Sequence, residues 1–489
     1  MGMKLFAAEL DFRPVAEEFD LPTSFPADVE REAELATDRF PDERRDLVDV
    51  PFVTIDPAGS MDLDQAVHIE AEPHPATGQT GWRVRYAIAD VAAFITPGSA
   101  LEAESIHRGQ TMYLPDEPVR LHPTALSEGS ASLLPDQIRP AVVWDIHVAP
   151  DGEVDTFTVY RARVRSVARF DYDDAEADML AGTLHPAIAE LPALGAARQR
   201  SDLRRHAINL RLPSVSVVTT TSDATPQRPA PSSVGDDRVY SLTVDPRGLM
   251  NDYNAELSLL AGMCAGQMMV AAGRGVLRTL PPASDKALAE FDAAATALGY
   301  DRAGRHVGEL LAEVDASTPR GMAVMRDAQR LLRGAGYVPI GLTDAPGEPE
   351  IHAGIGGYYA HVTAPLRRLV DRFGTEICLA IAEERPVPDW VEETLPAVVE
   401  AMDSSSQKAN KVDRACLNLT EAVVLRPWVG QNFSATVLHS GDSSAQVFLE
   451  QPPVIADCQG TPHEATTAVV TLITADPASR EVEFAWPAD

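Results

Sequence analysis

The segment Thr54-Ile-Asp-Pro-Ala-Gly-Ser-Met-Asp-Leu-Asp-Gln65 decides how this chain is interpreted. Phe52–Ile55 is aromatic and β-branched, which predicts a strand, and the proline and glycine that follow predict a loop. Asp56, Asp62 and Asp64 therefore fall at a strand end and in the loop after it. Because carboxylates so close together repel one another, we expect a hard divalent cation between them, and Mg²⁺ prefers such oxygen ligands.

Two chemical interpretations of this acidic cluster remain open from the residues alone. Two divalent ions about 4 Å apart would stabilise both the attacking and the leaving oxygen of an in-line phosphoryl displacement. The alternative is a solvated acidic loop, since aspartate is common in turns. The spacing does not match a calcium-binding EF-hand, whose glycine and terminal glutamate are absent.

A second group of polar residues occurs near the end of the middle region, in Tyr359-Ala-His-Val-Thr-Ala-Pro-Leu-Arg-Arg368, followed by Asp371. Adjacent arginines beside a hydroxyl and an imidazole are suited to holding phosphate. Arg367 could stabilise charge that develops on a phosphate during its cleavage. An ordinary helix start with surface arginines is the alternative.

The composition favours a multidomain globular protein with an acidic surface. The chain has 489 residues, 45% of them hydrophobic, and a net charge of −32; its length suggests two to four structural units. This charge argues against non-specific binding of nucleic acid over the surface, but a locally basic channel inside an acidic shell remains compatible with it. We find no uninterrupted apolar run of about 18 residues and no signal peptide, and therefore expect no membrane segment.

The four cysteines are far apart and form no Cys-x-x-Cys pair. We therefore expect reduced thiols and a cytoplasmic protein, without a zinc site or a disulfide framework. The four are Cys264, Cys378, Cys416 and Cys458.

The pattern of elements predicts an α+β protein in several parts. Residues 1–45 read as a short, mostly helical segment, and a mixed region of strands followed by helices then extends to about residue 415. Ser99 and Glu102 form a capping-box pattern that opens a helix over Leu101–Arg108. Residues 416–489 predict a small β-barrel of the OB type from five short strands. Those strands are expected at Ala422–Leu425, Phe433–Leu438, Ala445–Leu449, Ala468–Thr474 and Val482–Trp486.

Further strands are expected at Val67–Ile69, Trp82–Asp90, Ala141–Val148 and Val154–Arg165. The middle region predicts helices around 188–210, 252–273, 285–298 and 321–334. Loops are expected at Thr219–Asp237 and Pro339–Glu350, where serine, threonine, proline and glycine accumulate.

Taken together, these segments resemble the ribonuclease II family, whose catalytic unit is the RNB domain. The resemblance runs in order and spacing from about residue 21 to 412, and the tail resembles the RNA-binding OB domain that ends family members. The motifs that carry it are Thr54–Ala66, Ala87–Val91, Gly98–Gly109, Tyr113–Asp116, Leu126–Pro140, Leu331–Tyr337 and Tyr359–Asp371.

The resemblance implies a role for each matching residue. Asp56, Asp62 and Asp64 match metal-site aspartates, and Asp64 matches the one essential for the chemical step. Arg367 matches the catalytic arginine that contacts the scissile phosphate. Tyr113 matches an aromatic residue that stacks near the 3′-terminal nucleotides, although a tyrosine in the core is the alternative. Three further residues are expected in the RNA channel or behind it: Arg368, Arg139 and His361.

The sequence departs from the family pattern at several positions. Gln65 stands in place of a fourth aspartate, and its carbonyl carries no charge, so we expect lower metal affinity. Ala364 and Leu369 replace the usual serine and tyrosine. Ala255 and Gly262 replace a glutamate and an asparagine, whereas Glu256 matches. Family members also carry cold-shock domains before the catalytic one, and we expect this chain to be a variant without them.

The resemblance implies a processive 3′→5′ exoribonuclease that hydrolyses RNA to nucleoside 5′-monophosphates. We expect Mg²⁺ as the cofactor, with Mn²⁺ as a substitute, single-stranded RNA as the partner, including RNA with structured regions, and a monomer. A catalytically impaired RNA-binding protein on the same fold is the alternative, because of Gln65. A metal-dependent phosphatase or DNA nuclease would fit the aspartates but leaves the other motifs unexplained.

Overall fold

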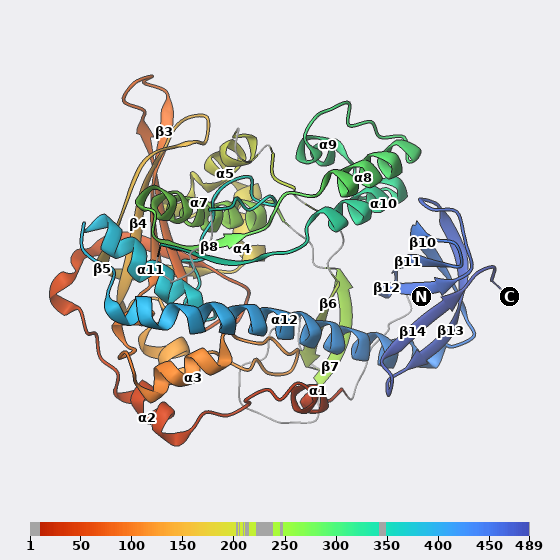
Figure 1. Ribbon diagram of the computed structural model, residues 1–489, viewed down its shortest axis with the longest axis horizontal. Helices are drawn as coiled ribbons and strands as arrows, with labels where there is room; N and C mark the ends of the chain where they lie inside the picture. The colour runs from red at the N-terminus through yellow and green to blue at the C-terminus, as the bar shows by residue number, and fades with distance from the viewer. Residues whose placement is uncertain are drawn as a thin grey trace.

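The computed structural model describes residues 10–201, 204, 206–208, 210, 215–221, 238–244, 248–341 and 349–488. Figure 1 shows two strand-rich bodies at opposite ends of the molecule, connected by the long helix α12 (Asp389–Leu425). The predicted loops at Thr219–Asp237 and Pro339–Glu350 lie largely outside the described residues.

The first body is a closed five-stranded barrel in the order β1-β2-β3-β4-β5, with β1 parallel to β5 and the other neighbours antiparallel. The strands predicted in this region are confirmed, but barrel closure was not predicted. Closure brings the end of β1, the start of β2 and the end of β5 to one end of the barrel. The bounds are β1 Arg45–Ile55, β2 Gln65–Pro73, β3 Thr80–Ala89, β4 Ile138–Val148 and β5 Val154–Phe170.

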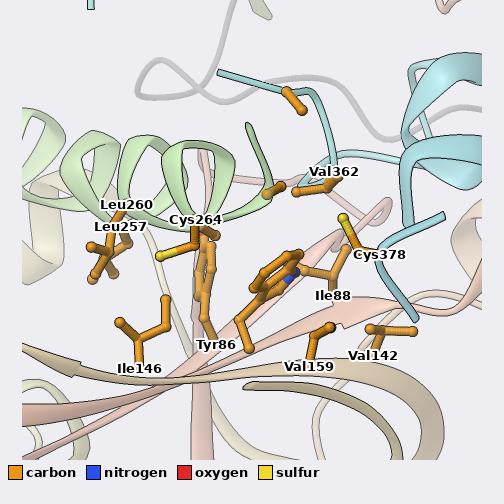
Figure 2. Close-up of a cluster of buried hydrophobic side chains, with 14 of the residues drawn as sticks. Tyr86, Ile88, Val142, Ile146, Val159, Leu257, Leu260, Cys264, Val362 and Cys378 are labelled. Atoms are coloured by element: carbon orange, nitrogen blue, oxygen red, sulfur yellow. The ribbon is translucent and has the colours of Figure 1, made fainter. Parts of the chain in front are cut away.

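Two helices cover this barrel and form the main core with it. Figure 2 shows Tyr86 and Ile88 of β3 beneath Leu260 and Cys264 of α7 (Leu249–Ala272), with Cys378 of α11 (Leu369–Ala382) beside them. The side chains of β3, α7 and α11 are buried against one another. The two helices therefore hold the chain between α7 and α11 in a fixed position on the barrel.

Helix α7 has the length and mean hydropathy of a membrane span, the one such helix in the described part of the chain. No membrane span was predicted, because the sequence has no uninterrupted apolar run of about 18 residues. Helix α7 reaches the hydropathy of a membrane span only as an average over such a window. More than half of its most apolar window, 56%, is buried inside the protein. Its burial against the barrel identifies α7 as a core helix.

Shorter helices surround the barrel and extend above α12. The predicted Ser99 cap is confirmed, because its hydroxyl accepts the Glu102 N–H at 3.3 Å. The bounds are α1 Arg13–Glu18, α2 Ala27–Leu35, α3 Ala100–Arg108, α4 Tyr172–Ala181, α5 Leu191–Arg200, α8 Asp285–Ala297, α9 Val307–Glu313 and α10 Pro319–Ala328. Two hairpins complete this part, β6 Val215–Thr221 with β7 Arg238–Val244, and β8 Gly275–Thr279 with β9 Gly336–Ile340.

The second body is the C-terminal barrel, closed in the order β10-β11-β12-β14-β13. The strand predicted at Ala422–Leu425 is wrong, because these residues form the last turn of α12, and the strand Pro453–Gln459 was missed. A short apolar run suits a helix or a strand equally, and here the preceding helix continues through it. The bounds are β10 Asn432–Ser440, β11 Ser444–Glu450, β12 Pro453–Gln459, β13 Thr467–Asp476 and β14 Glu481–Ala485.

Candidate active site

The two sequence motifs meet at one end of the first barrel. Asp64 lies directly before β2, and its Oδ1 accepts the backbone N–H of Leu366 at 2.8 Å. Its Oδ2 is 3.5 Å from Nε of Arg367. The structure therefore brings the predicted catalytic aspartate and the predicted catalytic arginine into direct contact.

The carboxylates at this end are buried and act on one another electrostatically. Burial, opposed by the charge of Arg367 and reinforced by that of Asp62, raises the pKa of Asp56 to about 7. Burial also raises the pKa of Asp64 well above its usual range, again opposed by Arg367 and increased by Asp62. A divalent cation would relieve both the burial cost and this repulsion.

A metal ion fits this donor set. Oδ2 of Asp56 is buried and has no hydrogen-bond partner, so one carboxylate oxygen remains available as a ligand. Among the described residues, no three His, Cys, Asp or Glu side chains already converge as a closed ligand group. Mg²⁺ does not require one, because it usually keeps several waters and uses one or two carboxylates together with substrate phosphate.

Ser132 holds the loop that carries Asp62. Its hydroxyl donates to the carbonyl of Met61 at 2.6 Å and accepts the N–H of Leu63 at 3.0 Å, so it bridges the residues on either side of Asp62. The next residue, Leu133, donates its N–H to the carbonyl of Leu63. Ser132 lies within the family motif Leu126–Pro140, but no role was predicted for it.

Arg139 supports the same loop. Its guanidinium donates to the carbonyl of Ser132 from Nε at 3.1 Å and to that of Gly129 from Nη2 at 3.1 Å. Arg139 was predicted to lie in the RNA channel or to support it from behind. In the structure it contacts the segment Gly129–Ser132, which positions the loop of Asp62.

Arg368 and His361 also lie behind the catalytic end. Arg368 forms two hydrogen bonds to the fully buried carboxylate of Asp371, at 2.8 and 2.9 Å. Nδ1 of His361 is 2.8 Å from the hydroxyl of Tyr337. Burial, together with the charge of Arg368, lowers the pKa of His361 well below its usual range, so this ring is neutral at physiological pH.

Tyr113 is the exposed aromatic residue beside the two catalytic candidates. It is 38% exposed, and its hydroxyl hydrogen-bonds Arg367. Thr111 donates its N–H to the carbonyl of Arg367 at 3.0 Å, which ties the two segments together. An exposed ring in this position is suited to base stacking, and the core alternative for Tyr113 is not supported.

Gln65 uses its amide to connect three parts of the structure. Its Oε1 accepts the hydroxyl of Tyr86 at 2.7 Å, and its Nε2 donates to the carbonyl of Thr363 at 2.7 Å. The Tyr86 hydroxyl also lies 2.9 Å from that of Ser258 on α7. The amide therefore helps to position the segment Tyr359–Arg368, called the arginine segment below. An aspartate could not supply the N–H donor that bonds the Thr363 carbonyl.

Two glycines of α7 allow the arginine segment to pass close to the helix. A Cβ at Gly262 would lie 2.1 Å from the ring of Tyr359, and one at Gly266 would lie 2.6 Å from its backbone nitrogen. The N–H of Ala360 also bonds the Gly262 carbonyl at 3.0 Å. This packing explains the glycine at 262, whereas Glu256 is paired with Arg204 at 3.0 Å.

Comparison with known proteins identifies the class to which this fold and site correspond. The RNB domain model matches residues 44–377, and the RNase II-type exonuclease C-terminal S1 domain model matches residues 431–486. The chain belongs to the RNB-domain family.

Among individual proteins, the chain is similar to Ribonuclease R of Chlamydia trachomatis, with 26% identity over 86% of this chain and 58% of that protein. It is also similar to Exoribonuclease 2 of Glaesserella parasuis, with 28% identity over 80% of this chain and 59% of that protein. A shorter match to Ribonuclease R of Vibrio cholerae reaches 36% identity over 31% of this chain and 18% of that protein. The chain thus spans less than two thirds of these relatives.

Solved structures share the fold at low sequence identity. Mycoplasma genitalium RNase R in complex with ribose-methylated single-stranded RNA superposes with a TM-score of 0.82 at 18% identity, over 97% of this chain and 77% of that one. Yeast Ssd1, a pseudonuclease, superposes with a TM-score of 0.65 at 14% identity, over 88% of this chain and 53% of that one. The same fold therefore occurs in proteins described as nucleases and as a pseudonuclease.

Proposed function

We propose that this chain is a metal-dependent, processive 3′→5′ exoribonuclease that hydrolyses RNA to nucleoside 5′-monophosphates. The observation that carries the proposal is the contact of buried Asp64 with both Leu366 and Arg367, beside an Asp56 oxygen that has no other partner. RNA as substrate, the direction and the products follow from the family resemblance. We further propose a cytoplasmic monomer, and the four free, buried cysteines support a reducing compartment.

Asp56, Asp62 and Asp64 would hold the metal ion, with Mg²⁺ as the physiological cofactor and Mn²⁺ as a substitute. An ion held there would supply Lewis-acid polarisation of the scissile phosphate and would make an attacking water more acidic. Ser132 keeps the loop of Asp62 in place, and the Leu366 N–H fixes the orientation of the Asp64 carboxylate.

The remaining residues act on the RNA itself. Arg367 carries a permanent positive charge on a partly exposed side chain, and such a preorganised charge stabilises a phosphate as negative charge develops on it. Tyr113 stacks on a base near the 3′ end and orients Arg367 through its hydroxyl. We propose single-stranded RNA, including strands with structured regions, as the substrate.

A labelled-RNA assay tests this function. Purified protein is incubated with a 5′-labelled single-stranded RNA and Mg²⁺, beside an Asp64→Asn variant, whose amide oxygen can still accept the Leu366 N–H. A descending ladder with the parent chain, slowed in the variant by about 10²-fold or more, would support the proposal.

Two results would contradict it. RNA that stays intact but is bound would favour the alternative, a catalytically impaired RNA-binding protein. Equal cleavage of a deoxyribonucleotide strand would point to a nuclease that does not read the 2′-hydroxyl.

A further inference from the structure

A buried histidine bridges α3 and the arginine segment and has no part in the function proposed above. His122 is 1% exposed. Its Nδ1 lies 3.1 Å from the hydroxyl of Ser105 on α3, and its Nε2 lies 3.2 Å from the carbonyl oxygen of Pro365. Pro365 is two positions before Arg367, so the ring contacts the chain close to the proposed catalytic arginine.

The surroundings of His122 determine which ring nitrogen carries the proton. Burial, opposed by the hydrogen bond to Pro365 and reinforced by nearby arginine charges, lowers the pKa of His122 to about 3, so the ring is neutral at physiological pH. Because a carbonyl oxygen can only accept, the single ring proton is on Nε2. Nδ1 is then an acceptor, and it shares the Ser105 hydroxyl with the Leu101 carbonyl, which is 2.7 Å from that hydroxyl. His122 is therefore a donor to the arginine segment.

This donor reaches one particular peptide group, the one that joins Pro365 to Leu366. Proline has no N–H, so its carbonyl is the only hydrogen-bonding group of its own backbone. The peptide bond is trans, and a trans peptide is planar with its oxygen and its N–H on opposite edges. His122 donates to the oxygen, and Asp64 accepts the N–H at 2.8 Å. A buried histidine and the proposed catalytic aspartate thus hold the same plane from its two edges.

The two-sided contact links His122 to the catalytic groups. Hydrogen bonds in a chain polarise one another, so donation to the carbonyl makes the N–H of the same peptide a stronger donor. His122 thereby strengthens the bond that orients the Asp64 carboxylate. Ala364, directly before this peptide, donates its N–H to Asp371 at 2.6 Å. With both neighbouring N–H groups bonded, the bond from His122 fixes the rotation of the plane that leads into Arg367.

We propose that His122 is a positioning residue for the exoribonuclease reaction: by holding the carbonyl edge of the Pro365–Leu366 peptide, it sets the N–H that orients Asp64. This inference rests on the proposed function. It requires turnover to depend on the Nε2 donor of His122, while RNA affinity does not.

Two substitutions separate the Nε2 donor from the rest of the side chain. In His122→Gln the amide nitrogen reaches about as far as Nε2 of the ring and can donate to Pro365. In His122→Asn the shorter amide reaches only as far as Nδ1 and can keep only the contact with Ser105. Turnover of a single-stranded RNA with Mg²⁺ should fall by about tenfold in the Asn variant and stay within about threefold of the parent in the Gln variant.

Two further measurements distinguish positioning from a general loss of structure. RNA affinity, measured by fluorescence anisotropy with a chelator in place of Mg²⁺, should be the same in the parent and in both variants. Hydrogen–deuterium exchange at the Leu366 amide should be faster in the Asn variant and unchanged in the Gln variant. His68→Asn is the matched control. This histidine on β2 is also buried, at 8% exposed, but its ring lies 3.4 Å from Arg85, so turnover should not change.

Equal turnover in the Gln and Asn variants, whether high or low, would overturn the proposal, because the two amides differ in whether they reach Pro365. A parent chain that does not hydrolyse RNA would overturn the proposed function instead. In that case the exchange rate of the Leu366 amide still decides the role of His122, and an unchanged rate in the Asn variant would refute it.

Discussion

Asp64 and Leu366 are 302 positions apart in the chain, and the carboxylate of one accepts the backbone N–H of the other at 2.8 Å. Because Arg367 follows Leu366 directly, this bond holds the acidic loop next to the proposed catalytic arginine. The same carboxylate then meets the guanidinium with its second oxygen. The two halves of the site are thus aligned by a group that also takes part in the proposed chemistry.

Ser132→Ala should raise the metal concentration needed for half-maximal activity by about tenfold, because supporting hydrogen bonds behind metal ligands typically contribute this much. The reason is the loss of both bonds that bridge Asp62. Initial rates against Mg²⁺ concentration, and direct Mn²⁺ binding by electron paramagnetic resonance, provide the measurement. Ser127→Ala is the control, since this serine is equally buried but bonds only the carbonyls of His122 and Pro123. An identical metal requirement in both variants would rule out the positioning role.

Gln65→Glu should destabilise the protein by about 1–3 kcal/mol, because a carboxylate would replace the donor that faces the Thr363 carbonyl. Urea unfolding with and without Mg²⁺ measures this, with the exposed Gln431→Glu as control. Mg²⁺ should stabilise both variants to the same extent. Stabilisation by Mg²⁺ of the Gln65→Glu variant alone would show instead that position 65 lies within the metal site.

Tyr113→Ala should weaken RNA binding by about 1–3 kcal/mol, the contribution typical of one stacked base. Tyr113→Phe keeps the ring and loses only the hydroxyl that bonds Arg367, so its affinity should stay close to that of the parent while its turnover falls. Affinity is measured in the Asp64→Asn background and turnover in the active protein. If both variants lost the same affinity, the hydroxyl and not the ring would be responsible for binding.

Glu421→Gln should change how stability depends on pH. Burial at the end of α12 raises the pKa of Glu421 from 4.5 to about 8. The folded protein then holds a proton that the unfolded chain releases, so this group's contribution is complete below pH 4.5 and is lost as pH rises through about 8.

Above that pH the Gln variant should be more stable than the parent, by about 5 kcal/mol. Urea unfolding across this range measures the difference, with the exposed Glu400→Gln as control. A parent whose stability does not fall over this range, relative to the Gln variant, would contradict the assignment.

Much of the fold could be predicted from local patterns. The strands over Phe52–Ile55 and Ala141–Val148 and the helix after Ser99 follow from β-branched runs and a capping pair, and all three are present. Barrel closure could not be predicted, because the parallel pairing of β1 with β5 depends on contacts far apart in sequence. The end of α12 was misjudged for a related reason, since Ala422–Leu425 takes its conformation from the helix before it.

The residues of the site that could be predicted are those whose side chains have a distinctive chemistry, namely the aspartates and the arginine. Asp64 and Arg367 do meet, as the motifs suggested. The supporting residues were not predictable, because a serine or a glutamine has no distinctive chemistry until its neighbours are known. Ser132 is identified by bonds to the residues on either side of Asp62, and Gln65 by bonds to β3 and to the arginine segment.

Helix α12 is 37 residues long, which corresponds to about 55 Å at the usual rise per residue. It packs against α11 and α3 near the first barrel and against β13 and β14 of the second, so one continuous helix connects the two barrels. An RNA strand long enough to contact both barrels would therefore meet two surfaces that α12 holds at a fixed separation. Under the proposed processive function, the RNA advances by one nucleotide at a time while the two barrels keep their relative positions on α12.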